Sequence, residues 1–149
     1  MCCEDTFLKQ LRRRGFRLTP QREMVLQAMH EVEPHATAEE VYARVSALSS
    51  AVDLSTVYRT LELLQEFHLV ATIDLGDGQL RYELLGLHGR HHHLLCHACG
   101  KLVRVEQEEL QGMIDALVET HGFAAEPEHL IIPGLCEKCR QAAEARKAA

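Results

Sequence analysis

The sequence predicts an α+β protein in two parts: a helical first half that ends in a β-hairpin, and a small α/β second half. Three observations support this fold class. Apolar residues recur at helical spacing over residues 18–69. Apolar and β-branched segments then flank "GDGQ", which is typical of a hairpin turn. The second half shows the order strand, strand, helix, strand, and two Cys-x-x-Cys pairs bracket the last three of these elements.

Four helices are predicted in the first half, over residues 7–14, 18–31, 37–48 and 54–69. The last three begin at residues that suit the N-cap position, where a side-chain oxygen accepts a hydrogen bond from a backbone N–H. Thr19 precedes Pro20, Thr37 can form a capping box with Glu40, and Ser55 can cap the last helix.

The hairpin strands are expected at residues 69–75 and 79–85, and the glycine-containing "GLHGR" at 86–90 is a predicted hinge. We therefore expect a first domain over residues 1–85 and a second over residues 91–149. Three helices followed by a hairpin is the order of a winged helix-turn-helix, whose last helix enters the DNA major groove.

In the second domain, strands are predicted from residue 91 and over residues 101–105 and 128–135, with a helix over residues 106–122 that Gly122 ends. The two Cys-x-x-Cys pairs can supply four thiolates to one tetrahedral ion, which predicts a structural zinc site. Redox-active or simply reduced cysteines are the alternative. Cys2 and Cys3 stand apart from this set. The predicted ligands are Cys96, Cys99, Cys136 and Cys139.

Charge and composition limit the classes of function. The net charge is −6, but the first thirty residues concentrate arginine and lysine, so the N-terminal end is a basic pole that suits nucleic acid. No apolar run is long enough to span a bilayer, and "MCCEDTFLKQLRRRGF" lacks the apolar core of a signal peptide. These features lead us to expect a cytoplasmic protein with no membrane segment.

The histidines of "HHHLLC" remain once the thiolates are assigned to zinc. On a strand, His91 and His93 lie on one face and His92 on the other, so the first two can chelate a first-row divalent ion. Further ligands must come from elsewhere, and Glu83 at the end of the hairpin and His35 between two helices are the candidates. Ordinary surface or core roles are the alternative for His35 and Glu83.

A DNA contact surface is predicted on the last helix of the first half. Tyr58 and Arg59 lie in its first turn and away from its apolar face, where they can reach a base edge or a phosphate. Arg17 in the basic N-terminal segment is placed to reach the backbone or a narrow minor groove. Plain surface residues on a helical bundle are the alternative reading of all three.

Taken together, "GFRLTPQR", "HATAEEVY", "STVYRTLELL", "RYEL", "HHHLLCHACGK", "THGF" and "GLCEKC" resemble the ferric uptake regulator superfamily of bacterial metal-responsive repressors over nearly the whole chain. The resemblance implies a homodimer with an N-terminal winged-helix domain and a C-terminal α/β dimerisation domain, bound to an inverted-repeat double-stranded DNA operator. It implies Zn²⁺ on the four cysteines, a regulatory metal on His35, Glu83, His91 and His93, and DNA contacts by Arg17, Tyr58 and Arg59.

The chain also departs from the family pattern. Arg104 stands where many members carry a further carboxylate ligand, so the sensor site is expected to have four protein ligands. A third metal site of some members falls here on Arg90, His92, Gln111 and Glu128, and two of these four are poor ligands. We do not expect that site to form, although His121 and His129 lie nearby in sequence.

The resemblance also bears on the regulatory metal. Zinc-sensing relatives usually place a cysteine in the sensor site, whereas this chain has no cysteine between Cys3 and Cys96. Peroxide-sensing relatives tend to have aspartate where this chain has Glu83. Both differences favour Fe²⁺, with Mn²⁺, Zn²⁺ and Ni²⁺ left as alternatives because ligand preferences overlap. Two rivals of other classes are a zinc-dependent hydrolase built on His91, His93 and Glu83, and a metal-buffering or protein-binding module without a DNA role.

Overall fold

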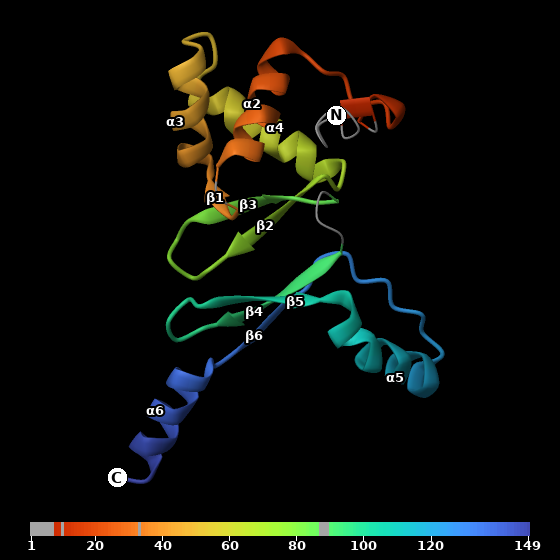
Figure 1. The fold of residues 1–149 in the computed structure, drawn as a ribbon, viewed down its shortest axis with the longest axis vertical. Coiled ribbons are helices and arrows are strands. Elements are labelled where there is room, and N and C mark those ends of the chain that lie inside the picture. The colour runs from red at the N-terminus through yellow and green to blue at the C-terminus, as the bar shows by residue number, and fades with distance from the viewer. Residues whose placement is uncertain (1–7, 10, 33, 87–89) are drawn as a thin grey trace. The chain divides into compact units, whose positions relative to one another are not determined.

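The computed structural model describes residues 8–9, 11–32, 34–86 and 90–149. The chain forms two compact units. The first unit comprises the described residues of Met1–Asp74 and Gly78–Leu87, and the second comprises Leu75–Asp77 and the described residues of His88–Ala149. Figure 1 shows helices and sheet in both units. None of the described helices is long and apolar enough to cross a membrane. The mixed helix-and-sheet class that the sequence predicts is therefore confirmed.

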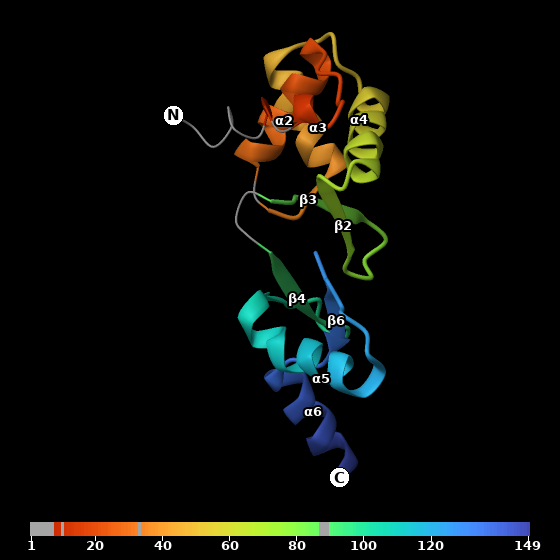
Figure 2. The ribbon, with the colours of Figure 1, turned by 90° about the vertical axis from the view of Figure 1, so that its right-hand side faces the viewer.

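In the first unit, three helices pack together beside a small sheet, as Figures 1 and 2 show. The helices are α2 (Pro20–Glu31), α3 (Ala38–Leu48) and α4 (Leu54–Glu66). The sheet has the order β1-β3-β2, with β1 (Ala36–Thr37), β2 (Val70–Asp74) and β3 (Leu80–Leu84) all antiparallel. Residues 8, 9 and 11–13 are also helical, and the rest of the helix predicted over 7–14 includes positions outside the described residues.

Local capping explains where these helices begin. The side chain of Thr19 accepts a hydrogen bond from the Arg22 N–H, and the capping box between Thr37 and Glu40 is present, so both predictions are confirmed. The prediction for α4 was wrong by two residues. Asp53, not Ser55, is the N-cap, because its carboxylate accepts from the backbone N–H of Thr56 at 2.7 Å.

The two units differ in the size of their apolar cores. In the first, α2, α3 and α4 bury one continuous cluster that includes Val25, Leu26, Val41, Val45, Val57, Leu61 and Leu64. In the second, the described cluster consists of Val105, Leu110 and Ile114, with Leu130 and Ile132 packed against it. A core this small rarely stabilises a domain without a metal, a disulfide or a partner chain.

The second unit is a three-stranded sheet with the order β5-β4-β6. Its strands are β4 (His91–Cys96), β5 (Leu102–Glu106) and β6 (Ile131–Gly134); β5 is antiparallel to β4, and β6 is parallel to it. Between β5 and β6 lie a 3₁₀ turn, η1 (Gln107–Leu110), and α5 (Gln111–His121), which Gly122 ends in a left-handed conformation, as predicted. The chain ends with α6 (Glu137–Lys147).

Candidate metal centres

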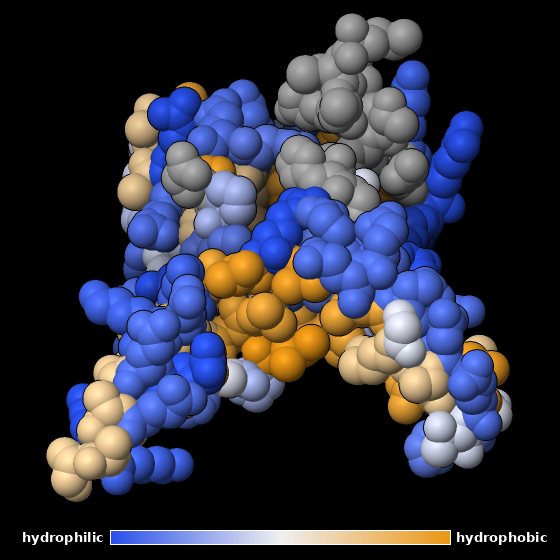
Figure 3. All heavy atoms as spheres, turned by 60° about the horizontal axis from the view of Figure 1, so that its bottom comes forward, coloured by the Kyte–Doolittle hydropathy of each residue, from blue (hydrophilic) through white to orange (hydrophobic). Residues whose placement is uncertain are grey.

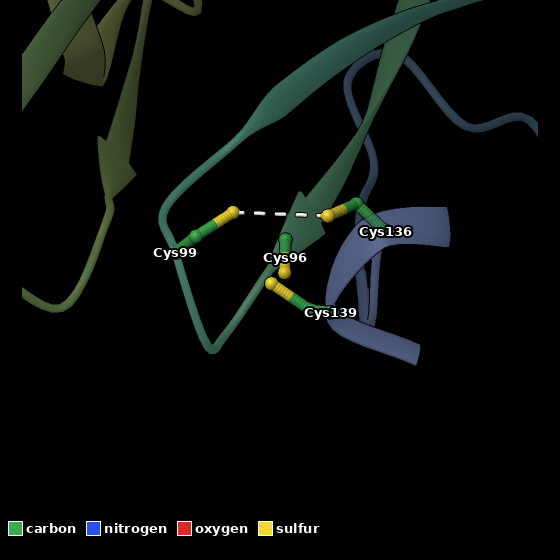
Figure 4. A group of neighbouring side chains, drawn as sticks. All are labelled: Cys96, Cys99, Cys136 and Cys139. Atoms are coloured by element: carbon green, nitrogen blue, oxygen red, sulfur yellow. Dashed lines mark hydrogen bonds between the residues drawn. The ribbon is translucent and has the colours of Figure 1, made fainter. Parts of the chain in front are cut away.

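Four cysteines converge at one end of the second unit's sheet (Figure 4). Cys96 ends β4 and Cys99 lies in the turn that follows, where Gly100 adopts a left-handed conformation with φ 74°. Cys136 is the N-cap of α6, and Cys139 lies in the first turn of that helix. Segments separated by 37 residues in sequence thus supply two sulfurs each, as the paired motifs predict.

The spacing of the sulfurs fits zinc. All four Sγ atoms lie within 4.8 Å of one another, and those of Cys99 and Cys136 are 3.8 Å apart. A tetrahedral ion with Zn–S bonds of about 2.3 Å holds its sulfurs about 3.8 Å apart. All four cysteines are free of disulfide bonds. The group therefore accepts a structural zinc ion with little rearrangement and leaves no position open for a catalytic water.

The thiols of this group titrate over a wide range. Hydrogen bonds from backbone groups of Cys136 and Cys99 lower the pKa of Cys96 to about 6. Hydrogen bonds with the side chains of Cys136 and Cys99 raise the pKa of Cys139 to about 12. One thiolate forms readily, whereas the last proton is held by its neighbours until a cation replaces it. Metal binding at this group must therefore release protons.

The first unit brings His35 and Glu83 together. His35 lies between α2 and α3 with φ 71°, a left-handed conformation that is uncommon for residues other than glycine. Its Nε2 is 3.2 Å from Oε2 of Glu83, which lies on β3 and is 8% exposed. Pairing of β1 with β3 places Ala36 opposite Tyr82. This pairing brings together His35, which precedes Ala36, and Glu83, which follows Tyr82. An imidazole and a carboxylate in this arrangement suit a divalent metal ion.

The second unit brings His91 and His93 together, as strand alternation predicts. Both are buried, with exposed fractions of 3% and 2%, and their ring centroids are 5.0 Å apart. The structure adds His129, which the predicted ligand set lacks. Its ring centroid lies 5.6 Å from that of His91 and 4.9 Å from that of His93. Each of the three rings offers a nitrogen within 4.8 Å of the other two.

His129 was missed because its position depends on strand pairing. β6 runs parallel to β4 with Ile131 opposite His93, so the segment just before β6 carries His129 to the rings of His91 and His93. The sequence indicates a strand near residue 128 but not which strand it joins. The approach of His129 to the two histidines is visible only after this pairing is known.

His92 lies on the other face of β4 and is fully buried. Its Nδ1 accepts a hydrogen bond from the Leu130 N–H at 3.0 Å, so the neutral ring donates from Nε2 to Oε1 of Gln107 at 2.6 Å. Both ring nitrogens are thus occupied by structural hydrogen bonds. Glu128 is exposed. His92 thus has a structural role, and the absence of a third metal site around His92 and Glu128 stays a prediction.

Substitution of His92 tests this structural role. His92→Ala leaves the Leu130 N–H and the Gln107 side chain without their partner and opens a cavity, so we expect the free energy of unfolding to fall by about 2–4 kcal/mol. His92→Asn, whose oxygen can replace Nδ1, should cost less. Urea denaturation of the zinc-loaded protein measures both changes. Equal stability of wild type and His92→Ala would contradict the role.

The predicted DNA contacts all lie on the first unit. Arg17, Tyr58 and Arg59 are exposed. The Tyr58 hydroxyl donates to Oε1 of Glu39 at 2.7 Å, which raises the pKa of Tyr58 and lowers that of Glu39. Arg59 donates to the hydroxyl and the backbone carbonyl of Ser55.

A polar groove lies beside Arg59, between the start of α2 and α4. It is lined by Thr19, Gln21, Arg22, Thr56, Arg59 and Thr60. Arg22 is oriented there by donating to the carbonyl oxygen of Arg17 at 2.7 Å and by lying over the ring of Phe16. The sequence alone does not single out Arg22, since its place in the groove follows from the packing of α2 against α4.

Comparison with known proteins agrees with this architecture. The family described as the ferric uptake regulator family matches residues 13–132. The chain is 38% identical over 138 residues to the ferric uptake regulation protein of Bacillus subtilis (strain 168), covering 91% of this chain and 93% of that protein. It is 33% identical over 134 residues to the ferric uptake regulation protein of Synechococcus elongatus, covering 89% and 91%.

A solved structure is also similar. It is the ferric uptake regulator from Pseudomonas aeruginosa with manganese, with a TM-score of 0.72, 26% identity, and coverage of 87% of this chain and 96% of that one. Proteins of this family are transcription regulators rather than enzymes, so the hydrolase alternative is set aside. Family match, cysteine cluster and histidine groups lead to one conclusion: the chain belongs to the ferric uptake regulator family.

Proposed function

We propose that the chain is a metal-dependent repressor of metal-homeostasis genes that binds DNA in the cytoplasm and responds to Fe²⁺. One observation carries the proposal: this member of the family has two separate kinds of metal-binding group. The cysteine cluster suits zinc, and the histidine and carboxylate groups suit a second, harder divalent ion. Two groups with different chemistry allow one metal to hold structure and another to carry a signal.

The first unit is proposed to bind DNA as a winged helix-turn-helix. The order α2, α3, α4 and the β2–β3 hairpin supports this, with α4 as the recognition helix. Tyr58 and Arg59 are exposed and lie in the second turn of α4, and they would contact bases and phosphates together with Arg17. The groove containing Arg22 and Arg59 offers two guanidinium groups to one stretch of phosphate backbone.

We propose that the functions are divided between the two domains predicted from the sequence. Residues 1–85 form the DNA-binding domain, residues 91–149 form the dimerisation and metal-binding domain, and residues 86–90 form a hinge. Positions 87–89 of that hinge lie outside the described residues. The two compact units support this division, because each carries its own sheet and its own apolar cluster.

A homodimer is proposed for the second unit, supported by apolar surface on its elements. Large hydrophobic side chains are exposed on β4, β5 and α5 and in the segments after α5 and β6: Leu94, Val103, Met113, Val118, Phe123 and Leu135. Three of them, Leu94, Val103 and Leu135, line a groove on the sheet. Figure 3 shows hydrophobic surface gathered on the face turned to the viewer. Exposed patches of this kind mark protein interfaces.

The regulatory mechanism is proposed to depend on His35 and Glu83 of the first domain and His91 and His93 of the second. One divalent ion would be coordinated by all four side chains. Ligation by both pairs would fix the angle between the two domains and so the separation of the two recognition helices in a dimer. That separation must match one helical turn of DNA, about 34 Å, or a multiple of it. Occupancy would therefore shift the population toward the DNA-binding arrangement.

The choice of iron is supported by the relatives and by one ligand. The two relatives described above are named ferric uptake regulation proteins, whereas the peroxide operon regulator of Bacillus subtilis is 29% identical over 132 residues. Glu83 stands where peroxide-sensing relatives tend to have aspartate. Manganese, zinc, nickel and peroxide sensing within the same family are the alternatives that the experiment separates.

Anaerobic DNA binding by the zinc-loaded protein tests the function. Fe²⁺, Mn²⁺, Zn²⁺ and Ni²⁺ are titrated in turn against a labelled operator library, and affinity is measured by fluorescence anisotropy at several salt concentrations. We expect Fe²⁺ to increase affinity about 5- to 150-fold. Affinity should also fall steeply with salt, because phosphate contacts release counterions. Affinity indifferent to every ion would overturn the proposal.

A further inference from the structure

The buried face of β4 that carries His91 and His93 has a third imidazole beside it, and its position is fixed by backbone hydrogen bonds. The Leu130 carbonyl accepts from the His93 N–H at 2.8 Å, and the Leu130 N–H donates to Nδ1 of His92 at 3.0 Å. Both polar backbone groups of the residue after His129 are thus attached to β4. His129 has little freedom to move away from the other two rings.

On the other edge of β4, the carboxylate level with His91 is held by a neighbouring arginine. On β5, Arg104 lies opposite His93, and Glu106 lies opposite His91. Arg104 donates from Nε to Oε1 of Glu106 at 2.6 Å, which lowers the pKa of that carboxyl group. A guanidinium cation cannot coordinate a metal ion. Because Glu106 is engaged by Arg104, the further ligand that we infer comes from the β6 side and is His129.

The chemistry of the three rings fits one divalent ion. Their nitrogens lie within 4.8 Å of one another, and a first-row ion with bonds of about 2.1 Å needs nitrogens roughly 3–3.5 Å apart. Small side-chain rotations close that difference. Three imidazoles held this close repel one another if protonated, whereas their lone pairs can share a cation when neutral.

We propose that His129 is a ligand of the regulatory metal, together with His91 and His93, and takes the place that Arg104 cannot fill. The inference rests on the proposed function and names a ligand beyond the four expected from the sequence. The second unit then offers three nitrogen donors by itself. A nitrogen-rich set favours Fe²⁺, Co²⁺, Ni²⁺ and Zn²⁺ over Mn²⁺ more strongly than a carboxylate-rich set would.

The test uses Co²⁺ as a spectroscopic probe on full-length, zinc-loaded protein under anaerobic conditions. Wild type, His129→Ala, His129→Gln and His91→Ala are titrated against a competing chelator, and visible absorption records the ligand field. Glu128→Gln is the matched control, because Glu128 is the exposed neighbour of His129. Far-UV circular dichroism and zinc content verify that each variant is folded.

We expect both His129 variants to lose at least about tenfold in Co²⁺ affinity and to show altered d–d bands, with Glu128→Gln like wild type. X-ray absorption should count one imidazole fewer in the His129 variants. Wild-type affinity and spectrum in His129→Ala, alongside loss of binding in His91→Ala, would overturn this inference and leave the proposed function standing. Absence of any Co²⁺ site beyond the zinc site in wild type would overturn both.

Discussion

Replacement of Cys96 by serine is expected to unfold the second unit. Its described apolar cluster buries only Val105, Leu110 and Ile114, so the unit depends on the ion that joins the end of β4 to the start of α6. Structural zinc contributes on the order of 10 kcal/mol to small metal-dependent folds at neutral pH. Loss of one of four thiolates at a buried position should therefore remove the folded state and not merely weaken it.

Zinc content, circular dichroism and light scattering measure this outcome for Cys96→Ser. We expect less than one zinc per chain, loss of part of the strand and helix signal, and loss of the dimer. His97→Ala is the control, because His97 is exposed in the same turn and is not part of the cysteine group. A Cys96→Ser protein that stays folded and dimeric, and loses only its response to the regulatory metal, would show that the two groups have the opposite roles.

Replacement of His91 by alanine is expected to leave the second unit folded and to remove the response to the regulatory metal. His91 belongs to the imidazole group, and its ring makes no part of the cysteine cluster. The variant should keep its zinc and its fold, because the backbone pairing of β4 with β5 and β6 is unchanged. It should lose the metal-dependent gain in DNA affinity, about 5- to 150-fold.

Fluorescence anisotropy with and without Fe²⁺ measures this change, on the same operator for wild type and variant. His121→Ala is the matched control, since His121 lies exposed in the last turn of α5. We expect the affinity of the metal-free protein to be the same in all three. A His91→Ala protein that still responds to Fe²⁺ with wild-type amplitude would exclude this residue from the sensor.

The parts of the fold that follow from local chemistry were predictable from the sequence. Helix starts at Thr19 and Thr37 and the helix end at Gly122 depend on residues within one turn, and all three are confirmed. The predicted start of α4 was wrong because Asp53 and Ser55 are both residue types that suit an N-cap. In the structure the Asp53 carboxylate accepts the hydrogen bond from the Thr56 N–H. The two-residue strand β1 could not be foreseen, since it exists only through its pairing with β3.

The candidate metal groups divide in the same way. Paired cysteines and alternating histidines on one strand carry their geometry in their spacing, so the cysteine cluster and the His91–His93 pair were predictable. The meeting of His35 with Glu83 and the approach of His129 depend on contacts between segments distant in sequence. The register of a parallel strand pair is set by the whole unit, and no local pattern announces it.

The parallel pairing of β4 with β6 also links the maturation of the two metal groups. Cys96 is level with Gly134, two residues before Cys136, and His93 is level with Ile131, two residues after His129. A slip in the pairing of β6 would displace Cys136 and His129, which flank this strand, from their partners together. Capture of zinc by a newly made chain therefore selects the alignment that the histidines need. If the histidines bind the proposed regulatory metal, protein made without zinc is therefore expected to lack that second site as well.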